Sequence, residues 1–181
     1  MLATISLKQT LTVLLRDVPD FPKQGIIFKD ITPLLANPIA RRQVVLAMAE
    51  HFSKQNIQAV AGVEARGFIF GSLLAQELNV PFVPIRKSGK LPYDKIKEEY
   101  SLEYGKAAIE MHTDAIPAGC RVLIHDDLLA TGGTATAAGR MVERLGGQVA
   151  GYSFIINLSF LQGDKILTDR FKIHPHYLIS F

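Results

Sequence analysis

The sequence is short of several features that would assign it to a particular class of protein. It has one cysteine, Cys120, in 181 residues, so neither an intrachain disulfide nor a cysteine metal cluster can form. No uninterrupted apolar stretch approaches the ~18 residues of a membrane span, and residues 1–8 lack the basic start and apolar run of a signal peptide. We therefore expect a soluble, cytoplasmic protein that does not act at membranes.

The sequence also lacks a large excess of charge of either sign. The formal net charge is +3, from 20 Lys and Arg against 17 Asp and Glu. Nucleic-acid-binding surfaces usually cluster Lys and Arg on one face, whereas the longest basic runs here are the pairs at 41–42 and 86–87. The mild basic excess suits an anionic small molecule and gives no indication of a nucleic-acid partner.

What the chain does have is the composition of one folded domain. Hydrophobic residues make up 48% and charged residues 20%, which is enough apolar material for a core. We expect a single domain over residues 1–181. The predicted strands are residues 57–63, 81–85, 102–111, 121–125, 149–158 and 177–181. The predicted helices are residues 6–16, 68–78, 133–145 and part of 164–181. A further helix is predicted to begin at Asn37-Pro38, with a buried stripe of Ile39, Val45, Met48, Ala49 and Phe52. Such alternation favours an α/β fold with a mostly parallel central sheet flanked by helices.

Two further segments read as irregular. Residues 19–25 contain two prolines and a glycine and are predicted to form a loop after the first helix. Residues 86–100 are rich in Lys, Glu, Gly and Pro, and are predicted to form a long polar loop. Loops of that length inside a compact domain are usually functional.

The strongest functional signal follows the predicted strand at 121–125. Ligands of open parallel sheets bind beyond the carboxyl ends of the strands, and Thr131-Gly132-Gly133-Thr134 lies there, where a helix begins. Glycines allow close approach of the backbone, and the unpaired N–H groups of a helix start favour phosphate. The segment is therefore predicted to hold a phosphate group.

Asp126 and Asp127 precede this segment and would repel a phosphate unless they had another task. They could accept hydrogen bonds from sugar hydroxyls, each worth roughly 1.5–3 kcal/mol, or hold a divalent cation that also touches the phosphates. An ordinary acidic turn is the alternative without function. Other nucleotide motifs are absent, since the chain has neither Gly-x-Gly-x-x-Gly nor Gly-x-x-x-x-Gly-Lys-Ser/Thr. A phosphorylated ribose fits these residues best.

At this point the sequence resembles a known family. Residues 122–134 resemble the phosphoribosyl-pyrophosphate signature of the type I phosphoribosyltransferases. Matches to the adenine-specific members follow in family order at residues 20–23, 25–33, 64–71, 86–92 and 101–106. The resemblance implies the type I phosphoribosyltransferase fold, with a small N-terminal hood over about residues 1–35 and a mobile lid over about residues 86–105. It also implies a homodimer.

The same resemblance implies the reaction of adenine with 5-phosphoribosyl 1-pyrophosphate, giving AMP and pyrophosphate with Mg²⁺ in purine salvage. Each part of the substrates is assigned a set of residues. The ribose and its 5′-phosphate would contact Asp126, Asp127, Ala130, Thr131, Gly132, Gly133 and Thr134. Pyrophosphate would contact Glu64, Ala65, Arg66, Arg86, Lys87 and Lys90, and adenine would contact Ile26, Ile27, Phe28 and Lys29. Mg²⁺ would be held mainly by substrate and water, near Asp126 and Asp127.

Catalytic roles fall to Arg66, Glu103 and Tyr104. Glu103 is the candidate for handling the adenine proton, with Tyr104 near the sugar, and the lid would exclude water from an oxocarbenium-like state. The resemblance also implies a non-proline cis peptide in the turn at 64–66. Lys29 stands where many members have arginine, and His125 stands where valine or isoleucine is usual. His125 could titrate near the site, although a histidine at the end of a central strand is more often a core residue satisfied by hydrogen bonds.

Two other functions remain open at the level of sequence. A regulator could keep the phosphoribosyl-pyrophosphate pocket without catalysing a reaction, but only about 20 residues precede the first family match. A phosphoribosyltransferase of another base specificity is the second alternative, against which residues 25–33 argue.

Overall fold

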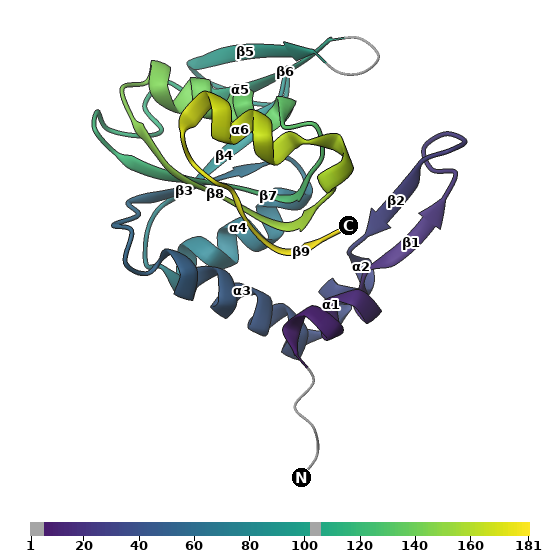
Figure 1. The fold of residues 1–181 in the computed structure, drawn as a ribbon. Coiled ribbons are helices and arrows are strands. Elements are labelled where there is room, and N and C mark those ends of the chain that lie inside the picture. Colours follow the sequence, from purple (N-terminus) through teal and green to yellow (C-terminus); the bar gives the residue numbers. More distant parts are fainter. Residues whose placement is uncertain (1–5, 102–105) are drawn as a thin grey trace. The chain divides into compact units, whose positions relative to one another are not determined.

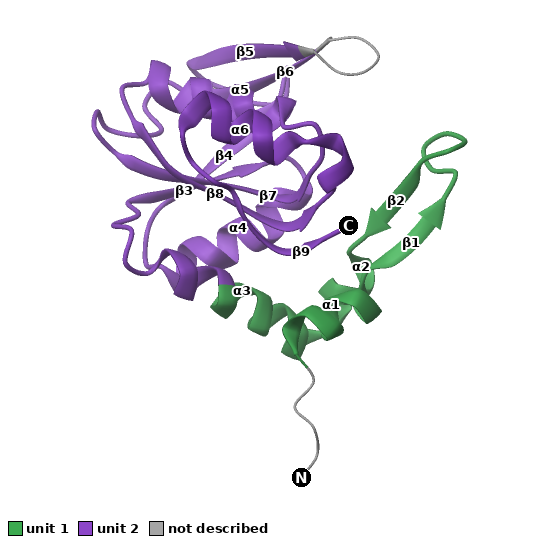
Figure 2. Ribbon diagram, in the orientation of Figure 1, with its two compact units in different colours: residues 1–47 green, residues 48–181 purple. Residues whose placement is uncertain are grey.

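The computed structural model describes residues 6–101 and 106–181, without the side chains of Ser101 and Lys106. Its contacts divide the chain into two compact units, residues 1–47 and residues 48–181 (Figure 2). None of the described helices is long and apolar enough to cross a lipid bilayer.

The first unit contains short helices and a two-stranded hairpin (Figure 1). Its elements are α1 (Leu7–Leu14), β1 (Arg16–Pro19), β2 (Ile27–Asp30), α2 (Thr32–Ala36) and the first part of α3 (Pro38–Phe52). Helix α1 begins at a capping box, in which Ser6 and Gln9 each accept the other's backbone N–H. The predicted loop is the connection between β1 and β2, which pair antiparallel. The sequence did not predict these strands, because each has only four residues and neither shows a clear alternation of apolar and polar positions.

Helix α3 begins where the sequence predicted. The Asn37 side chain accepts the backbone N–H of Ala40 at 3.0 Å, and Pro38 is the first helical residue. Four members of the predicted stripe are buried. The fifth, Ile39, was predicted wrongly, since it is 72% exposed. It lies in the first turn, where the next residue, Ala40, takes the buried position instead.

The second unit is built on a seven-stranded sheet of order β5-β6-β4-β3-β7-β8-β9. The strands are β3 (Ala59–Val63), β4 (Phe82–Lys87), β5 (Lys95–Ser101), β6 (Lys106–His112), β7 (Arg121–Leu129), β8 (Gln148–Asn157) and β9 (His176–Ser180). From β4 to β9 all neighbours pair parallel, and the hairpin β5–β6 joins the β4 edge antiparallel. The predicted α/β fold with a mostly parallel sheet is confirmed.

Helices cover both faces of this sheet. Helices α5 (Gly133–Arg144) and α6 (Gly163–Phe171) lie on one face, and α4 (Arg66–Glu77) lies on the other (Figure 1). A 3₁₀ turn, η1 (Ser159–Leu161), precedes α6. Large side chains of the central strands, including Leu123, Tyr152 and Phe154, are fully buried between the layers.

The prediction of one long loop over residues 86–100 was wrong. Strand β4 continues to Lys87 and strand β5 begins at Lys95, so only residues 88–94 connect them. In β5 the side chains of Ile96, Glu98 and Tyr100 are half-buried, whereas those between them are exposed. The alternation of a strand is therefore present, but one inward position is a glutamate, and the Lys and Glu content of the segment concealed it.

Candidate functional site

The segment predicted to bind phosphate is a concave loop at the end of β7. Residues 128–135, together with Asp126 and Phe154, line a cavity of about 70 Å³, several times the space that one water needs. Gly132 has φ +79°, and helix α5 follows it with no acidic residue in its first turn. Glycine has no side chain that could cap the helix, so the first N–H groups of α5 have no side-chain partner. They lie at the positive end of the helix dipole, beside the cavity. We call residues 130–134 the phosphate loop.

One residue that supports this loop was missed by the sequence analysis. Gly163, the first residue of α6, packs against the backbone of the phosphate loop. A Cβ at Gly163 would collide with the Ala130 carbonyl oxygen, and it would lie 2.9 Å from the Gly132 nitrogen. A Cβ at Gly132 would in turn lie 3.0 Å from the Gly163 oxygen. Nothing near Gly163 in the sequence signals this contact, which joins segments about thirty residues apart.

The two aspartates lie within β7 rather than after it, because the strand extends four residues beyond the predicted end. Asp127 is 3% exposed, and its Oδ2 lies 3.0 Å from Arg66 Nε. Asp126 lines the cavity and accepts the backbone N–H of Asp127 at 2.9 Å. A Cβ at Gly67 would lie 2.9 Å from Asp126 Oδ1, so the missing side chain lets α4 approach that carboxylate.

Burial and the neighbouring charge of Asp127 raise the pKa of Asp126 well above its usual value. Burial also raises the pKa of Asp127, and the Arg66 guanidinium opposes this rise. Two adjacent carboxyls with raised pKa values favour a bound group that supplies hydrogen-bond donors or positive charge. Such a group would allow both to be ionised.

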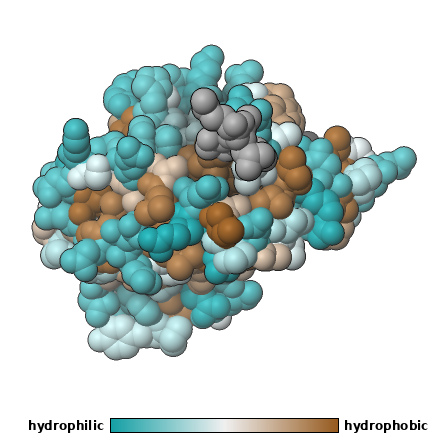
Figure 3. Space-filling model, turned by 90° about the horizontal axis from the view of Figure 1, so that it is seen from below, coloured by the Kyte–Doolittle hydropathy of each residue, from teal (hydrophilic) through white to brown (hydrophobic). Residues whose placement is uncertain are grey.

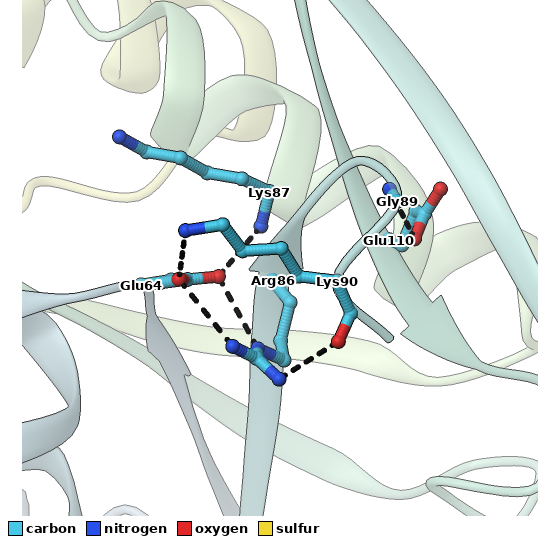
Figure 4. Close-up of polar contacts among 6 residues, drawn as sticks. All are labelled: Glu64, Arg86, Lys87, Gly89, Lys90 and Glu110. Atoms are coloured by element: carbon cyan, nitrogen blue, oxygen red, sulfur yellow. Dashed lines mark hydrogen bonds and ion pairs between the residues drawn. The ribbon is translucent and has the colours of Figure 1, made fainter. Parts of the chain in front are cut away.

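Glu64, at the end of β3, gathers the predicted pyrophosphate residues around its carboxylate (Figure 4). The peptide bond from Glu64 to Ala65 is cis, as the resemblance implied. The carboxylate accepts the Lys87 backbone N–H at 3.0 Å, and it pairs with Arg86 Nε at 3.2 Å and Lys90 Nζ at 3.1 Å. Burial opposes the charge of Glu64, but these donors outweigh it and lower its pKa to about 2.

Residues 86–90, which we call the basic turn, carry three cationic side chains that differ in pairing and exposure. The Arg86 guanidinium also donates to the Lys90 carbonyl at 2.7 Å, so Glu64 and the main chain fix its position. The Lys90 ammonium is paired yet more than half exposed. The Lys87 side chain points away from Glu64 (Figure 4). The structure thus brings together Glu64, Arg86 and Lys90 as predicted, and a multiply charged anion can share the cations that Glu64 holds.

The predicted adenine residues belong to the β1–β2 hairpin of the first unit. Ile27 is 57% exposed, whereas Phe28 packs edge-on against the ring of Phe21, with centroids 5.2 Å apart. The Lys29 ammonium pairs with Asp17 at 2.7 Å. Because that ammonium is already paired within the hairpin, recognition through main-chain groups remains the better interpretation for Lys29.

Three further residues were singled out by the sequence. Glu103 and Tyr104 lie outside the described residues. His125 is fully buried, as a core residue should be, but neither ring nitrogen has a hydrogen-bond partner among the described residues. Burial lowers its pKa to about 3, although the Ser153 peptide opposes this shift. Its full burial fits the interpretation as a core residue, with the Ser153 backbone as a polar neighbour.

Residues 6–101 and 106–181 contain no cluster of three or more His, Cys, Asp or Glu side chains that could hold a metal ion. A divalent cation at this site would need most of its ligands from water or substrate. Mg²⁺ commonly binds in that way, with one or two carboxylates and the substrate phosphates. The pair of Asp126 and Asp127 fits that description.

Comparison with known proteins agrees with the geometry. Residues 30–172 match the family model of the phosphoribosyl transferase domain. The adenine phosphoribosyltransferase of Nitrosococcus oceani is 53% identical over 165 residues, which cover 90% of this chain and 96% of that protein. The crystal structure of adenine phosphoribosyltransferase from Rhodothermus marinus is 51% identical with a TM-score of 0.91, covering 97% of this chain and 98% of that one.

A third relative was solved with ligands. The Saccharomyces cerevisiae adenine phosphoribosyltransferase, complexed with an imino-altritol bisphosphate and adenine, is 39% identical with a TM-score of 0.88, covering 97% of this chain and 100% of that one. The chain described here belongs to the phosphoribosyltransferase family, among the adenine phosphoribosyltransferases.

Proposed function

We propose that this chain transfers the 5-phosphoribosyl group from 5-phosphoribosyl 1-pyrophosphate to adenine, giving AMP and pyrophosphate. One observation carries the proposal: a single unit has two separate regions suited to phosphate groups. The phosphate loop offers main-chain N–H groups at a helix start, and the basic turn offers Arg86 and Lys90 around Glu64. A substrate phosphorylated at both ends of its ribose matches this pair of regions.

The proposed roles follow from charge. The phosphate loop holds the 5′-phosphate, and Asp126 and Asp127 accept hydrogen bonds from the ribose hydroxyls. Arg66, Arg86 and Lys90 bind the pyrophosphate, whose negative charge grows as the glycosidic bond breaks. Cations placed in advance at a developing charge lower the barrier of such a step. Glu103 handles the adenine proton with Tyr104 beside the sugar, a proposal that rests on the sequence resemblance.

Adenine is proposed to bind through the main chain at Ile27 and Lys29, with Ile26 and Phe28 as apolar neighbours. The exposed Ile27 and the paired Lys29 ammonium support this choice. Mg²⁺, bound to substrate near Asp126 and Asp127, would supply charge neutralisation for the diphosphate. Chelation should therefore abolish turnover and added Mg²⁺ should restore it, as measured by pyrophosphate release.

A base panel tests the proposal directly. Purified protein, Mg²⁺ and 5-phosphoribosyl 1-pyrophosphate are incubated with adenine, hypoxanthine, guanine or uracil, and nucleotide products are separated. We expect AMP from adenine and no nucleotide from the other bases. Turnover with hypoxanthine alone would overturn the adenine assignment but leave the phosphoribosyl donor in place. Binding of the donor without turnover of any base would instead favour a regulatory protein.

A cytoplasmic homodimer is also proposed. The single cysteine, Cys120, is buried and unpaired, which suits a reducing compartment. Exposed apolar side chains, including Val13 and Ile39, suit a contact between copies of the chain, and apolar surface is visible among hydrophilic residues on the face shown in Figure 3. Light scattering coupled to size-exclusion chromatography should give twice the mass of one chain, and a monomer mass would contradict the proposal.

A further inference from the structure

A second buried glutamate supports the basic turn from the opposite side to Glu64. Glu110 lies on β6, directly across from Arg86 of β4, and it is 4% exposed. Its Oε1 accepts the hydroxyl of Ser88 at 2.9 Å. Its Oε2 accepts the backbone N–H of Gly89 at 3.1 Å (Figure 4). Neither motif nor family resemblance singles out Glu110 in the sequence.

These contacts fix the main chain of the turn. Gly89 has φ +83°, a conformation that glycine enters and leaves easily, and its N–H is held by a side chain from a neighbouring strand. The Ser88 N–H is held in turn by the Ala108 carbonyl of β6 at 2.9 Å. The turn is thus anchored to β6 at two consecutive residues, immediately before Lys90.

The charge of Glu110 suits this task. Burial acts against ionisation, but the Gly89 N–H and the Ser88 hydroxyl outweigh it, so the pKa of Glu110 lies below its usual value. The positive charge of Lys95 contributes in the same direction. Glu110 is therefore an ionised acceptor at neutral pH, and charge-assisted hydrogen bonds are stronger than neutral ones.

Two glutamates therefore stabilise different parts of the basic turn. Glu64 holds the side chains of Arg86 and Lys90, whereas Glu110 holds the main chain that carries them. We propose that Glu110 is a positioning residue for the pyrophosphate end of the substrate, acting through Ser88 and Gly89 and never touching the ligand. This inference rests on the proposed function of the basic turn.

The test compares Glu110→Ala with Glu110→Gln. Alanine removes both acceptors, so we expect the dissociation constant of pyrophosphate and the KM for the phosphoribosyl donor to rise about tenfold, with the KM for adenine changed less than twofold. Glutamine keeps an oxygen for the Gly89 N–H, and its amide can donate to the Ser88 hydroxyl oxygen. It should restore most of the affinity, to within about threefold of the unmodified protein.

A matched control comes from the same hairpin. Glu98 is a half-buried carboxylate on β5 that pairs with Arg140 and Arg144 of α5 rather than with the turn. Glu98→Ala should leave pyrophosphate binding within twofold. Equal weakening by Glu98→Ala and Glu110→Ala would overturn the proposal, because general loosening of the hairpin would then explain both.

Two further variants keep the test decisive. If Glu110→Ala does not fold, Ser88→Ala removes only the hydroxyl that donates to Glu110 Oε1 and leaves the carboxylate with the Gly89 N–H, and it should raise the pyrophosphate dissociation constant about threefold. Unchanged binding in Ser88→Ala would then overturn the proposal. Lys90→Ala distinguishes a wrong role for Glu110 from a wrong function for the whole basic turn. If Lys90→Ala weakens pyrophosphate binding and Glu110→Ala does not, only the role of Glu110 is wrong. If neither does, the proposed function of the basic turn is wrong.

Discussion

The phosphate loop and the basic turn, the two proposed anion sites of the second unit, are built in different ways. The phosphate loop relies on main-chain N–H groups at the start of α5 and needs glycine at Gly132 and Gly163 for its shape. The basic turn relies on the side chains of Arg86 and Lys90, which Glu64 holds in place, and on a main chain that Glu110 holds through Ser88 and Gly89. The first site depends on backbone geometry and the second on a charge network, so they should respond differently to mutation, salt and pH.

The largest expected effect is at the phosphate loop. Gly132→Ala introduces a Cβ 3.0 Å from the Gly163 oxygen at a residue with φ +79°. The strain costs about 1–2 kcal/mol, and the shifted N–H groups should lower kcat/KM for the phosphoribosyl donor by roughly 100-fold. Steady-state kinetics measure the change.

Gly119→Ala is the matched control for this variant. Gly119 has φ +78° but open space around the position of a Cβ. It should carry a similar backbone strain with activity within twofold. If both variants lost activity equally, general destabilisation rather than loop geometry would be responsible.

The next effect concerns the basic turn. Arg86→Ala removes charge-assisted contacts worth roughly 1.5–3 kcal/mol, so the KM for the phosphoribosyl donor should rise by about 30-fold. Lys97→Ala, which removes an exposed lysine paired with Glu99 at 3.5 Å, should change it less than twofold. A comparable rise in both variants would indicate a diffuse electrostatic effect instead of a defined site.

A smaller effect distinguishes positioning from simple neutralisation. Glu64→Gln keeps the shape of the side chain but loses the charge that orients Arg86 and Lys90. Positioning predicts about a fivefold weaker affinity for pyrophosphate, measured by calorimetry. Because the pKa of Glu64 is about 2, the difference should be constant from pH 5 to 9. Tighter binding by the variant would mean that Glu64 only neutralises the cations.

A separate effect is on stability rather than on ligand binding, in the strand that carries the phosphate loop. The folded-state pKa of His125 is about 3, below the usual histidine value of 6.5. The unfolded chain therefore binds the proton more readily, and stability is lost as the pH falls from 6.5 towards 3. Lowering the pH from 7 to 5 should therefore decrease the free energy of unfolding by about 2 kcal/mol through this residue.

His125→Val should therefore lose less stability than the unmodified protein over that interval, with activity at pH 7.5 within about twofold. Urea unfolding at pH 7 and pH 5 measures the difference. His176, whose pKa burial and His51 lower to about 4, is present in both proteins and sets the remaining slope. An equal loss in the two proteins would show that His125 does not titrate as its burial requires.

The same contrast explains what the sequence could predict. The phosphate loop was predictable because strand, glycines and helix start are consecutive in the chain. The position of Asp126 and Asp127 within β7 was not, because the end of a buried strand depends on pairing with β8. Strand β5 was concealed by charged residues, of which Glu98 faces α5 and pairs there with Arg144 at 2.9 Å.

The supporting residues lay beyond any local pattern. Glu110 contacts residues 21 and 22 positions earlier in the chain, and α5 and β8 lie between Gly163 and the phosphate loop in the sequence. An isolated glutamate or glycine in a sequence carries no information about such distant partners. Residues proposed to contact the ligand were therefore easier to predict than residues that hold them in place.

The central claim is that two separate regions hold the two ends of one substrate, and calorimetry with its two halves tests it most directly. Ribose 5-phosphate and pyrophosphate are titrated separately into the unmodified protein, Gly132→Ala and Arg86→Ala, with Mg²⁺ present. We predict that Gly132→Ala weakens binding of ribose 5-phosphate strongly and spares pyrophosphate, and that Arg86→Ala does the reverse. Equal weakening of both ligands in both variants would contradict the account.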